Sequence, residues 1–388
     1  MKNKVIALVP LRGGSKSIPK KNIKLINGKP LCSWSLEAAY KSKIFDRIIV
    51  STDSEEISRI VQSLGCDIEV IMRPPELATD TATTESVMLH IKNIIDFDII
   101  VTIQATSPLV SSEDFINAYS KFEKENLDSL VTGVRTKRFF WTMDGIPLNY
   151  DPFNRPRRQS FDGIFMENGA FYITKRDILE KYNCRLGGKI GVYEMSEDTA
   201  IEIDEPSDWN VVENLLRNKN QSVLNSRLKQ IKMLVMDVDG VLTDGGMYYS
   251  ENGDELKKFN TRDGKGIELL RSLNIKTAIV TSENTKIVEH RAKKLKIDYL
   301  YMGVQDKFEV INKLKMSSQI SFEEMAYIGD DINDLPVMEV VGVFASPNDA
   351  IDLIKNKVDI RLTLNGGEGA VRQLCEMIIG AINNDQNC

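Results

Sequence analysis

The chain has 388 residues, of which 42% are hydrophobic and 27% are charged, and its formal net charge is −6. This length exceeds what one hydrophobic core usually supports, so we expect two domains. An acidic chain of ordinary globular composition argues against a general nucleic-acid-binding protein, and any bound nucleotide should be a small molecule at a local basic site.

The cysteines and the apolar runs indicate the cellular compartment of the protein. The five cysteines are scattered and form no C-x-x-C pair, which argues against a metal cluster or a disulfide framework and fits a reducing cytoplasm. The chain contains no run of about 18 apolar residues, so no membrane span is predicted. Arg12 follows the first apolar run too closely for a signal peptide. We therefore expect a cytoplasmic protein with no membrane partner.

Strand and helix patterns alternate in the first half of the chain. Short apolar runs predict strands over 5–9, 46–51, 68–72 and 98–103, and helices are predicted near 30–41, 54–64, 84–95 and 112–122. Such alternation is typical of a parallel sheet with helices on both faces, in which ligands bind at the carboxyl ends of the strands. The loops expected at those ends are 10–22, 51–54, 73–84 and 104–112.

The pattern loosens after a strand predicted at 129–134. Residues 135–163 are rich in Arg, Phe, Pro and Asn and suggest an inserted arm. A strand pair near 164–173 and 190–194, a short strand at 201–204 and a helix from Pro206 to about Leu216 complete a first domain of residues 1–218. The polar, aperiodic stretch 217–226 indicates a linker at 219–228.

The second half, residues 229–388, begins a new sheet. Strands are predicted near 231–236, 277–281, 299–301, 325–328, 342–344 and 360–362. Helices are predicted near 263–273, 286–295, 307–316, 331–340, 347–354 and 369–382, with a β-flap near 246–259. The predicted fold class is therefore α/β, with two doubly wound three-layer α/β/α domains.

The loop that follows the first strand carries the chemistry of the first domain. It reads V-P-L-R-G-G-S-K-S-I-P-K-K-N, with four cations, Arg12, Lys16, Lys20 and Lys21. A cationic, glycine-containing loop at a strand end is suited to holding phosphates. Neither the Walker spacing nor the dinucleotide fingerprint is present. The alternative is a surface turn whose lysines are only solvated.

Polar residues follow successive strands of the second domain. They are Asp237, Asp239, Thr281, Lys307, Asp330 and Asp334. Because strand tips in one parallel sheet lie side by side, we expect them to converge. Carboxylates grouped in this way suit Mg²⁺, which would offset repulsion between an aspartate nucleophile and a phosphate. Thr281 or Ser282 can hold the phosphate by its hydroxyl, and Lys307 by charge. The alternative is a set of solvated acidic turns, but such turns would not be expected to carry these residue types in this order at successive strand ends.

The second domain resembles the haloacid dehalogenase superfamily. The motifs D-V-D-G-V-L-T-D-G-G, F-N-T-R-D-G-K-G-I, Q-D-K, I-G-D-D-I-N-D-L-P and G-G-E-G-A-V-R are similar to the small capless branch that contains 3-deoxy-octulosonate 8-phosphate phosphatase. The resemblance implies that Asp237 is a nucleophile forming an aspartyl-phosphate and that Asp239 is general acid and then base. It also implies Mg²⁺ bound by Asp237, the Asp239 carbonyl and Asp330, with Arg262 in the substrate site.

The first domain, about residues 4–216, resembles the acylneuraminate cytidylyltransferases. Besides the cationic loop, the matching segments are R-P-P-E-L-A-T-D-T-A-T-T-E-S at 73–86, Q-A-T-S-P-L at 104–109, E-N-G-A-F-Y at 167–172 and I-E-I-D at 201–204. The resemblance implies a reaction that joins CTP to a nonulosonic acid and gives the CMP-sugar and pyrophosphate.

The resemblance also assigns roles to residues of the first domain. Residues that would surround the triphosphate are Arg12, Gly13, Ser15, Lys16 and Lys21, of which Arg12 and Lys21 would be catalytic. Further substrate contacts are implied for Asn22, Arg73, Thr83, Thr84, Gln104, Asn168 and Tyr172, with Arg157 near the sugar. Glu202 and Asp204, alternating on a strand, would share Mg²⁺ at the α-phosphate.

Two departures from this family and three alternatives accompany the assignments. Glu202 stands where the family usually has Asp, and the segment 137–142, K-R-F-F-W-T, matches the animal form better than the short bacterial form. Gln104 could instead be a buried core amide, and Tyr172 could be ordinary core. R-P-R-R-Q at 155–159 could be a solvated turn or an import signal.

These observations together predict a bifunctional enzyme. One domain would hydrolyse the 9-phosphate of a nonulosonic acid such as N-acetylneuraminate or ketodeoxynonulosonate (KDN), and the other would activate the freed sugar with CTP. The phosphatase resemblance further implies a homotetramer formed through the C-terminal domain, in which the tail Gly366–Arg372 reaches a neighbouring site. Two alternatives stay open. The C-terminal domain could serve only for oligomer assembly, since animal relatives carry it with eroded acidic motifs, or the chain could bind nucleotide sugars without turnover.

Overall fold

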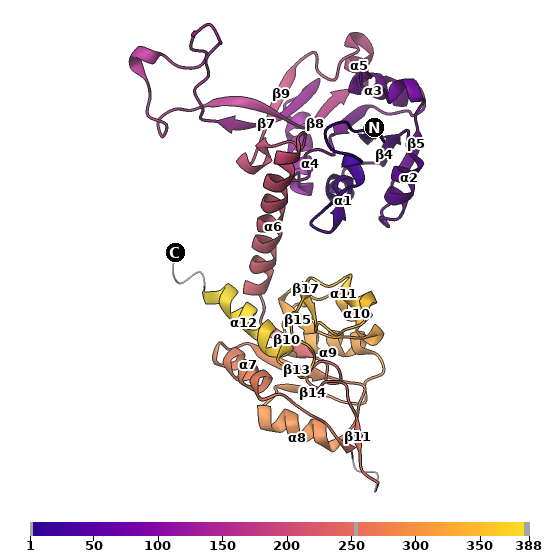
Figure 1. Ribbon diagram of the computed structural model, residues 1–388, viewed down its shortest axis with the longest axis vertical. Helices are drawn as coiled ribbons and strands as arrows, with labels where there is room; N and C mark the ends of the chain where they lie inside the picture. Colours follow the sequence, from indigo (N-terminus) through magenta and orange to yellow (C-terminus); the bar gives the residue numbers. More distant parts are fainter. Residues whose placement is uncertain (1–2, 252–254, 384–388) are drawn as a thin grey trace. The chain divides into compact units, whose positions relative to one another are not determined.

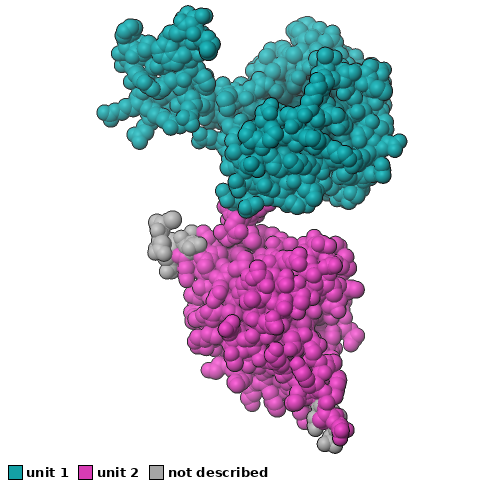
Figure 2. Space-filling view, in the orientation of Figure 1, with its two compact units in different colours: residues 1–218 teal, residues 219–388 magenta. Residues whose placement is uncertain are grey.

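The computed structural model describes residues 3–251 and 255–383. The chain divides into two compact units, residues 1–218 (unit 1) and 219–388 (unit 2), which Figure 2 shows in different colours. Within the described residues, we find no helix with the length and apolar character needed to cross a membrane.

Unit 1 is built on a seven-stranded sheet with the order β5-β4-β1-β6-β8-β7-β9 (Figure 1). The strands are β1 Val5–Leu11, β4 Arg47–Thr52, β5 Glu69–Met72, β6 Ile99–Ile103, β7 Ser129–Thr136, β8 Ile164–Lys175 and β9 Ile190–Met195. A small hairpin, β2 Leu25–Ile26 and β3 Lys29–Pro30, stands apart. The predicted α/β class is confirmed, but the sheet is mixed, because β8 runs antiparallel to both β6 and β7.

Helices cover both faces of this sheet. The helices are α1 Leu31–Ser42, α2 Glu55–Gln62, α3 Thr84–Lys92, α4 Ser112–Lys124 and α5 Arg176–Tyr182. Val5, Ala7 and Val9 of β1 join the core under α1, α2 and α4, whereas Ile6 and Leu8 join the core under α3 and α5. A strand buried on both faces is apolar at every position, which is why the short apolar runs were informative.

Three local expectations for unit 1 are wrong. β1 continues through Pro10, because β6 pairs with β1 only as far as Leu8 and a proline is tolerated where one strand edge is free. β8 and β9 are not paired with each other, because β7 lies between them. Residues 201–204 join no sheet, although the Ile203 amide donates to the Thr106 carbonyl.

The segment between β7 and β8 projects from unit 1 as an arm (Figure 1). The arm contains one short 3-10 helix, η3 Pro152–Asn154, and a small cluster in which Phe139 packs on Tyr150 and Phe161. Arg155 lies over the Phe139 ring. The inserted arm expected from composition is therefore present.

Helix α6 runs from Pro206 to Lys229 without a break. The expected helix end near Leu216 is wrong, and the polar stretch 217–226 is helical rather than a loop. Trp209 and Val212 of α6 pack in a core of unit 1, and Leu228 packs in a core of unit 2. Leu216 also packs in unit 1 and Leu224 in unit 2, but residues 217–222 between them are all polar. This run interrupts the apolar pattern and made the helix look as if it ended near Leu216.

Unit 2 contains a six-stranded parallel sheet with the order β14-β13-β10-β15-β16-β17. The strands are β10 Met233–Met236, β13 Lys276–Val280, β14 Tyr299–Tyr301, β15 Met325–Ile328, β16 Val343–Ser346 and β17 Ile360–Arg361. The helices are α7 Thr261–Ser272, α8 Lys286–Leu295, α9 Lys307–Ser318, α10 Leu335–Met338, α11 Asp352–Lys355 and α12 Ala370–Asn383. Helices α10 and α11 are shorter than predicted.

The flap of unit 2 is formed by two short antiparallel strands, β11 Tyr248–Tyr249 and β12 Glu255–Leu256. It follows the loop that leaves β10, as the sequence predicted. Residues 252–254 of the predicted flap lie outside the described residues.

Candidate active sites

A cleft in unit 1 lies at the carboxyl ends of β1 and β6. Its lining includes eight residues singled out in the sequence: Arg12, Ser15, Lys21, Asn22, Arg73, Thr83, Thr84 and Gln104. They come from loops far apart in the chain, which parallel strands bring to one edge. Gln104 is half-buried and lines the cleft, so the alternative of a buried core amide is wrong.

One acidic residue pairs with two cations of the loop. Asp80 Oδ1 lies 3.0 Å from Arg12 Nη1, and Asp80 Oδ2 lies 2.7 Å from Lys16 Nζ. The hydrogen bond from Lys16, followed by the charges of both cations, lowers the pKa of Asp80. Sequence reasoning assigned no role to Asp80, although it lies within the segment 73–86. Its carboxylate stands where the loop could otherwise hold an anion.

Gly13 and Arg73 converge on Asp53. The Gly13 amide donates to Asp53 Oδ1 at 2.8 Å, and Arg73 Nη2 lies 3.9 Å from the same oxygen. Burial lowers the pKa of Arg73, with the Asp53 charge opposing the shift. The buried Arg73 Nε has no hydrogen-bond partner among the described residues. Arg73 therefore has an unused donor at the cleft wall.

Two of the expected nucleotide contacts shape the loops themselves. The Asn22 side-chain amide donates to the Arg12 carbonyl at 2.9 Å. Thr83 caps α3, since its hydroxyl accepts from the Ser86 amide at 3.2 Å. Both side chains thus hold the walls of the cleft in place.

A group of carboxylates lies beside Lys21. Lys21 Nζ donates to the Ile203 carbonyl at 2.7 Å and to Asp204 Oδ1 at 3.2 Å. Burial, and then the charges of Asp204 and Glu167, raise the pKa of Glu202 to about 7. A carboxylate whose ionised form is destabilised by neighbouring negative charges is a candidate cation ligand. The sequence analysis missed Glu167, although it opens the E-N-G-A-F-Y segment.

Glu202 reaches this position over a glycine. Gly169 has φ +64°, and a Cβ built on it would lie 2.1 Å from Glu202 Oε1. A side chain at residue 169 would therefore displace the Glu202 carboxylate.

Three expected substrate contacts are not among the residues that line the cleft. Asn168 is buried, and its amide donates to Thr199 Oγ1 at 3.1 Å and accepts from the Ala170 amide at 3.3 Å. Tyr172 is also buried, donates to Glu167 and stacks under Arg185. Both side chains are buried because β8 is an inner strand, between β6 and β7 in the sheet. Arg157 is exposed on the arm.

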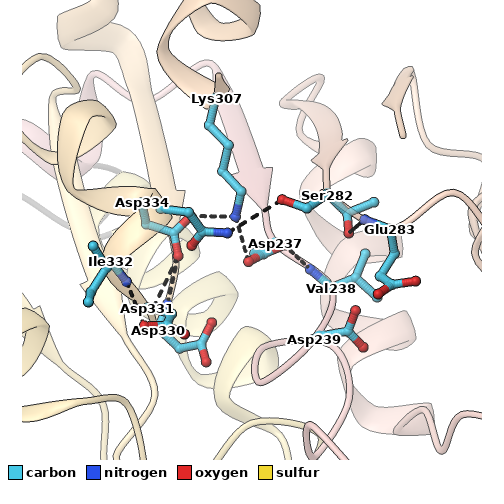
Figure 3. Close-up of polar contacts among 12 residues, drawn as sticks. Asp237, Val238, Asp239, Ser282, Glu283, Lys307, Asp330, Asp331, Ile332 and Asp334 are labelled. Carbon is cyan, nitrogen blue, oxygen red and sulfur yellow. Dashed lines mark hydrogen bonds and ion pairs between the residues drawn. The ribbon is translucent and has the colours of Figure 1, made fainter. Parts of the chain in front are cut away.

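The aspartates of unit 2 converge as expected at the tips of β10 and β15 (Figure 3). One carboxylate oxygen from each of Asp237, Asp330 and Asp334 lies within 4.8 Å of the others. Lys307, the first residue of α9, lies between two of them, with Nζ 2.6 Å from Asp237 Oδ2 and 2.7 Å from Asp334 Oδ1. Tyr327 donates to Asp334 Oδ1 at 2.6 Å.

Both carboxylate oxygens of Asp334 accept hydrogen bonds, whereas those of Asp330 accept none from the described residues. Asp334 Oδ2 accepts from the amides of Asp330 and Asp331 at 3.0 and 3.3 Å. The Asp330 carboxylate has no protein donor among the described residues. Burial, and then the charges of Asp237 and Asp334, raise the pKa of Asp330 to about 8. Burial raises the pKa of Asp237 to about 6, opposed by Lys307. This arrangement fits a divalent cation at Asp237 and Asp330.

Glycine at residue 240 allows the cluster to close. Gly240 has φ +73°, and a Cβ there would lie 2.0 Å from Asp330 Oδ2. The Asp330 carboxylate therefore occupies the space that a side chain at residue 240 would fill.

Asp239 points away from the cluster toward the flap. Lys257 Nζ donates to its two carboxylate oxygens at 2.7 and 2.8 Å, and Thr243 Oγ1 lies 3.3 Å from Oδ1. Although burial works against the ammonium, Asp239 raises the pKa of Lys257. Lys257 was missed in the sequence, because neither its spacing nor its neighbours link it to Asp239.

The remaining predicted residues of unit 2 lie around this centre. Thr281 is buried at the end of β13, and its hydroxyl accepts from the Glu283 amide at 3.1 Å. Ser282 is exposed beside Asn333, with Oγ 3.5 Å from the amide nitrogen. Arg262 is exposed at the start of α7.

The glycine-rich tail contacts its own unit. The Gly367 amide donates to the Val241 carbonyl at 3.0 Å, and the Arg372 amide donates to Asp263 Oδ1 at 2.8 Å. A Cβ at Gly366 would lie 1.9 Å from the Gly240 carbonyl oxygen. The tail thus packs against the loop that follows Asp239.

Unit 1 has the fold and cationic cleft of a nucleotide-binding enzyme, and unit 2 has the aspartate centre of a phosphoryl-transfer enzyme. The cytidylyltransferase family model matches residues 6–248. The chain is 32% identical over 390 residues to N-acylneuraminate cytidylyltransferase A of Danio rerio, covering 97% of this chain and 88% of that one. It is 33% identical to the Oncorhynchus mykiss enzyme, covering 97% and 89%.

A second set of relatives matches a shorter segment. Over 154 residues the chain is 42% identical to 3-deoxy-D-manno-octulosonate 8-phosphate phosphatase of Salmonella typhi, covering 40% of this chain and 82% of that one. The crystal structure of the Yersinia pestis phosphatase has 40% identity, a TM-score of 0.41 and coverage of 42% and 89%. The chain belongs to the N-acylneuraminate cytidylyltransferase family and carries a region of the 3-deoxy-D-manno-octulosonate 8-phosphate phosphatase family. Both predicted resemblances are confirmed.

Proposed function

We propose that unit 2 hydrolyses the 9-phosphate of a nonulosonic acid and that unit 1 transfers CMP from CTP to the freed sugar, releasing pyrophosphate. The observation that carries this proposal is the buried Asp237–Lys307 pair beside the unpartnered Asp330 carboxylate, in a chain of the cytidylyltransferase family. A phosphatase centre on such a chain is most simply explained by a phosphorylated precursor of the sugar that the cytidylyltransferase activates.

The chemistry in unit 2 follows from the Asp237 geometry. The Val238 amide donates to Asp237 Oδ1 at 2.7 Å and fixes the carboxylate for attack on phosphorus. The new Asp237–phosphorus bond forms as the bond to the sugar oxygen breaks, and Asp239, which enters this step protonated, gives the leaving oxygen its proton. Water then attacks phosphorus, Asp239 takes its proton, and Asp237 is released. Magnesium bound by Asp237, Asp330 and the Asp239 carbonyl would offset the charge of the phosphate.

In unit 1 the cations of the loop would bind the triphosphate. A sugar hydroxyl attacks the α-phosphorus, and the bond to the pyrophosphate oxygen breaks. Arg12, Lys16 and Lys21 offset the charge that develops on the pyrophosphate. Glu202 and Asp204 would hold a second magnesium ion, which supplies positive charge at the α-phosphate.

The test supplies ketodeoxynonulosonate 9-phosphate with and without CTP. We expect phosphate release in both cases and CMP-sugar only with CTP. Asp237→Asn should abolish phosphate release and leave CMP-sugar formation from the unphosphorylated sugar intact. Lys21→Ala should do the reverse. Loss of both activities in either variant would contradict the two-site proposal, and parallel kinetics with N-acetylneuraminate would rank the sugars.

One observation favours a second function for unit 2. The fish relatives match 97% of the chain, unit 2 included, and are named only as cytidylyltransferases. Unit 2 could then serve a homotetramer without catalysis. Truncation near residue 226 would cut α6, so Asp237→Asn in the full chain is the better test, with sedimentation measured beside activity. An oligomeric wild type that releases no phosphate from any sugar phosphate would favour assembly.

A further inference from the structure

The flap of unit 2 contributes a buried cation to the loop that follows β10. The side chain of Lys257, next to β12, is 0% exposed, and its ammonium group bonds both oxygens of Asp239. Lys257 is 18 residues from Asp239 in sequence. The contact therefore joins the flap to the residue assigned as general acid and base.

Asp239 has little else to hold it. Its side chain is 33% exposed, and the Thr243 hydroxyl at 3.3 Å is its other donor among the described residues. Without Lys257, we expect the Asp239 side chain to rotate toward solvent and lose its fixed orientation.

We propose that Lys257 is a positioning residue for the phosphatase reaction: it holds the Asp239 side chain in the orientation from which the protonated carboxyl gives its proton to the leaving oxygen and the carboxylate then takes a proton from the attacking water. The contact also couples that orientation to the flap. The proposal rests on the proposed phosphatase function of unit 2. Lys257 itself contacts neither the nucleophile nor the cation cluster. Its effect should therefore depend on how much the leaving group needs a proton.

The experiment compares two substrates with different leaving groups. p-Nitrophenol departs as an anion without a proton, whereas a sugar alkoxide needs one. The value of kcat/KM reports the steps up to departure of the leaving group. We expect Lys257→Met to lower kcat/KM by about tenfold or more for the sugar phosphate and much less for p-nitrophenyl phosphate. Lys257→Arg, which keeps the charge, should restore part of the loss.

The neighbouring residue provides a matched control. The Lys258 side chain is 59% exposed and lies 3.4 Å from Asp244 Oδ2, away from Asp239. Lys258→Met should leave both kcat/KM values unchanged. The fold of unit 2 is checked by its thermal transition, and CMP-sugar formation in the same chain checks that unit 1 is intact.

A second variant guards against a purely structural effect. Glu255 Oε1 lies 3.6 Å from Lys257 Nζ and is otherwise unpartnered, so Lys257→Met alone leaves a buried charge. The double variant Glu255→Gln, Lys257→Met removes that charge and should show the same substrate dependence. Equal losses for the two substrates, or rates at or above wild type, would overturn the positioning role. A wild type that hydrolyses neither substrate would instead overturn the proposed phosphatase function, and this role with it.

Discussion

Removing the Lys307 ammonium should strongly destabilise unit 2. Lys307 is 2% exposed and pairs with Asp237 and Asp334, which are 6% and 0% exposed. The variant Lys307→Met keeps the length and the apolar stem of the side chain but leaves Asp237, Asp330 and Asp334 grouped without a buried cation. Breaking a buried ion pair by removing one partner costs about 3–5 kcal/mol. Because the carboxylates can take up protons instead, we expect about 3 kcal/mol at pH 7.

The matched control is Lys313→Met on the same helix. Lys313 is 61% exposed and pairs with Glu309 one turn away at 2.7 Å. Exposed pairs of this kind contribute about 0.5 kcal/mol or less, so this variant should unfold close to wild type. The difference in unfolding free energy between the two variants separates the effect of losing a buried charge from the effect of losing any lysine of α9.

Urea unfolding can follow the two units separately. The three tryptophans, Trp34, Trp141 and Trp209, all lie in unit 1, so tryptophan fluorescence reports that unit alone. Far-UV circular dichroism follows both units. In EDTA, Lys307→Met should move the unit 2 transition to lower urea and leave the fluorescence transition in place.

The pH dependence gives an independent check. Removing Lys307 raises the folded-state pKa values of the carboxylates further above their unfolded values. A carboxylate with a raised folded pKa destabilises the fold as pH rises through that pKa, so the deficit should be largest near pH 8 and should shrink toward pH 4. The reasoning would be refuted if the urea midpoint of unit 2 in Lys307→Met equalled that of wild type at pH 7. It would also be refuted if Lys313→Met shifted this midpoint by the same amount as Lys307→Met.

Three further predictions concern other parts of the chain. Asp80→Asn should lower the KM for CTP a fewfold at low ionic strength, because Arg12 and Lys16 lose a competing anion, and the difference should shrink in high salt; a raised KM would show that Asp80 instead preorganises the loop. Gly240→Ala should abolish phosphate release and spare CMP-sugar formation. Gly380→Ala, where an added Cβ meets nothing within 4 Å, should leave both activities intact. Burial raises the pKa of Asp263 to about 6, so wild type should lose up to about 3 kcal/mol of stability from pH 4 to 7 through this group, and Asp263→Asn should lack that slope in thermal melts.

The strands and the strand-tip residues were readable from the sequence for one physical reason. A parallel strand covered on both faces is apolar throughout, and its carboxyl end must meet its neighbours, so the order of strands and polar residues along the chain predicts that Asp237, Lys307 and Asp330 lie together. The same reasoning assembled the cationic loop with Arg73 and Gln104.

Features that depend on contacts across the fold were not readable. The sequence shows Glu167, Asn168 and Tyr172 as one segment of a strand, but the place of β8 inside the sheet, between β6 and β7, decides that Asn168 and Tyr172 are buried. The polar run 217–222 interrupts the apolar pattern of α6, so the sequence suggested a loop where the helix continues to Lys229.

The sequence alone determined two α/β units, their order and the residues at their strand tips, because burial and backbone geometry act locally and periodically. Only the tertiary structure decided which charges meet: Asp80 with Arg12 and Lys16, and Lys257 with Asp239. Charge pairing depends on distances of a few ångströms between distant segments, and no pattern along the chain encodes those distances.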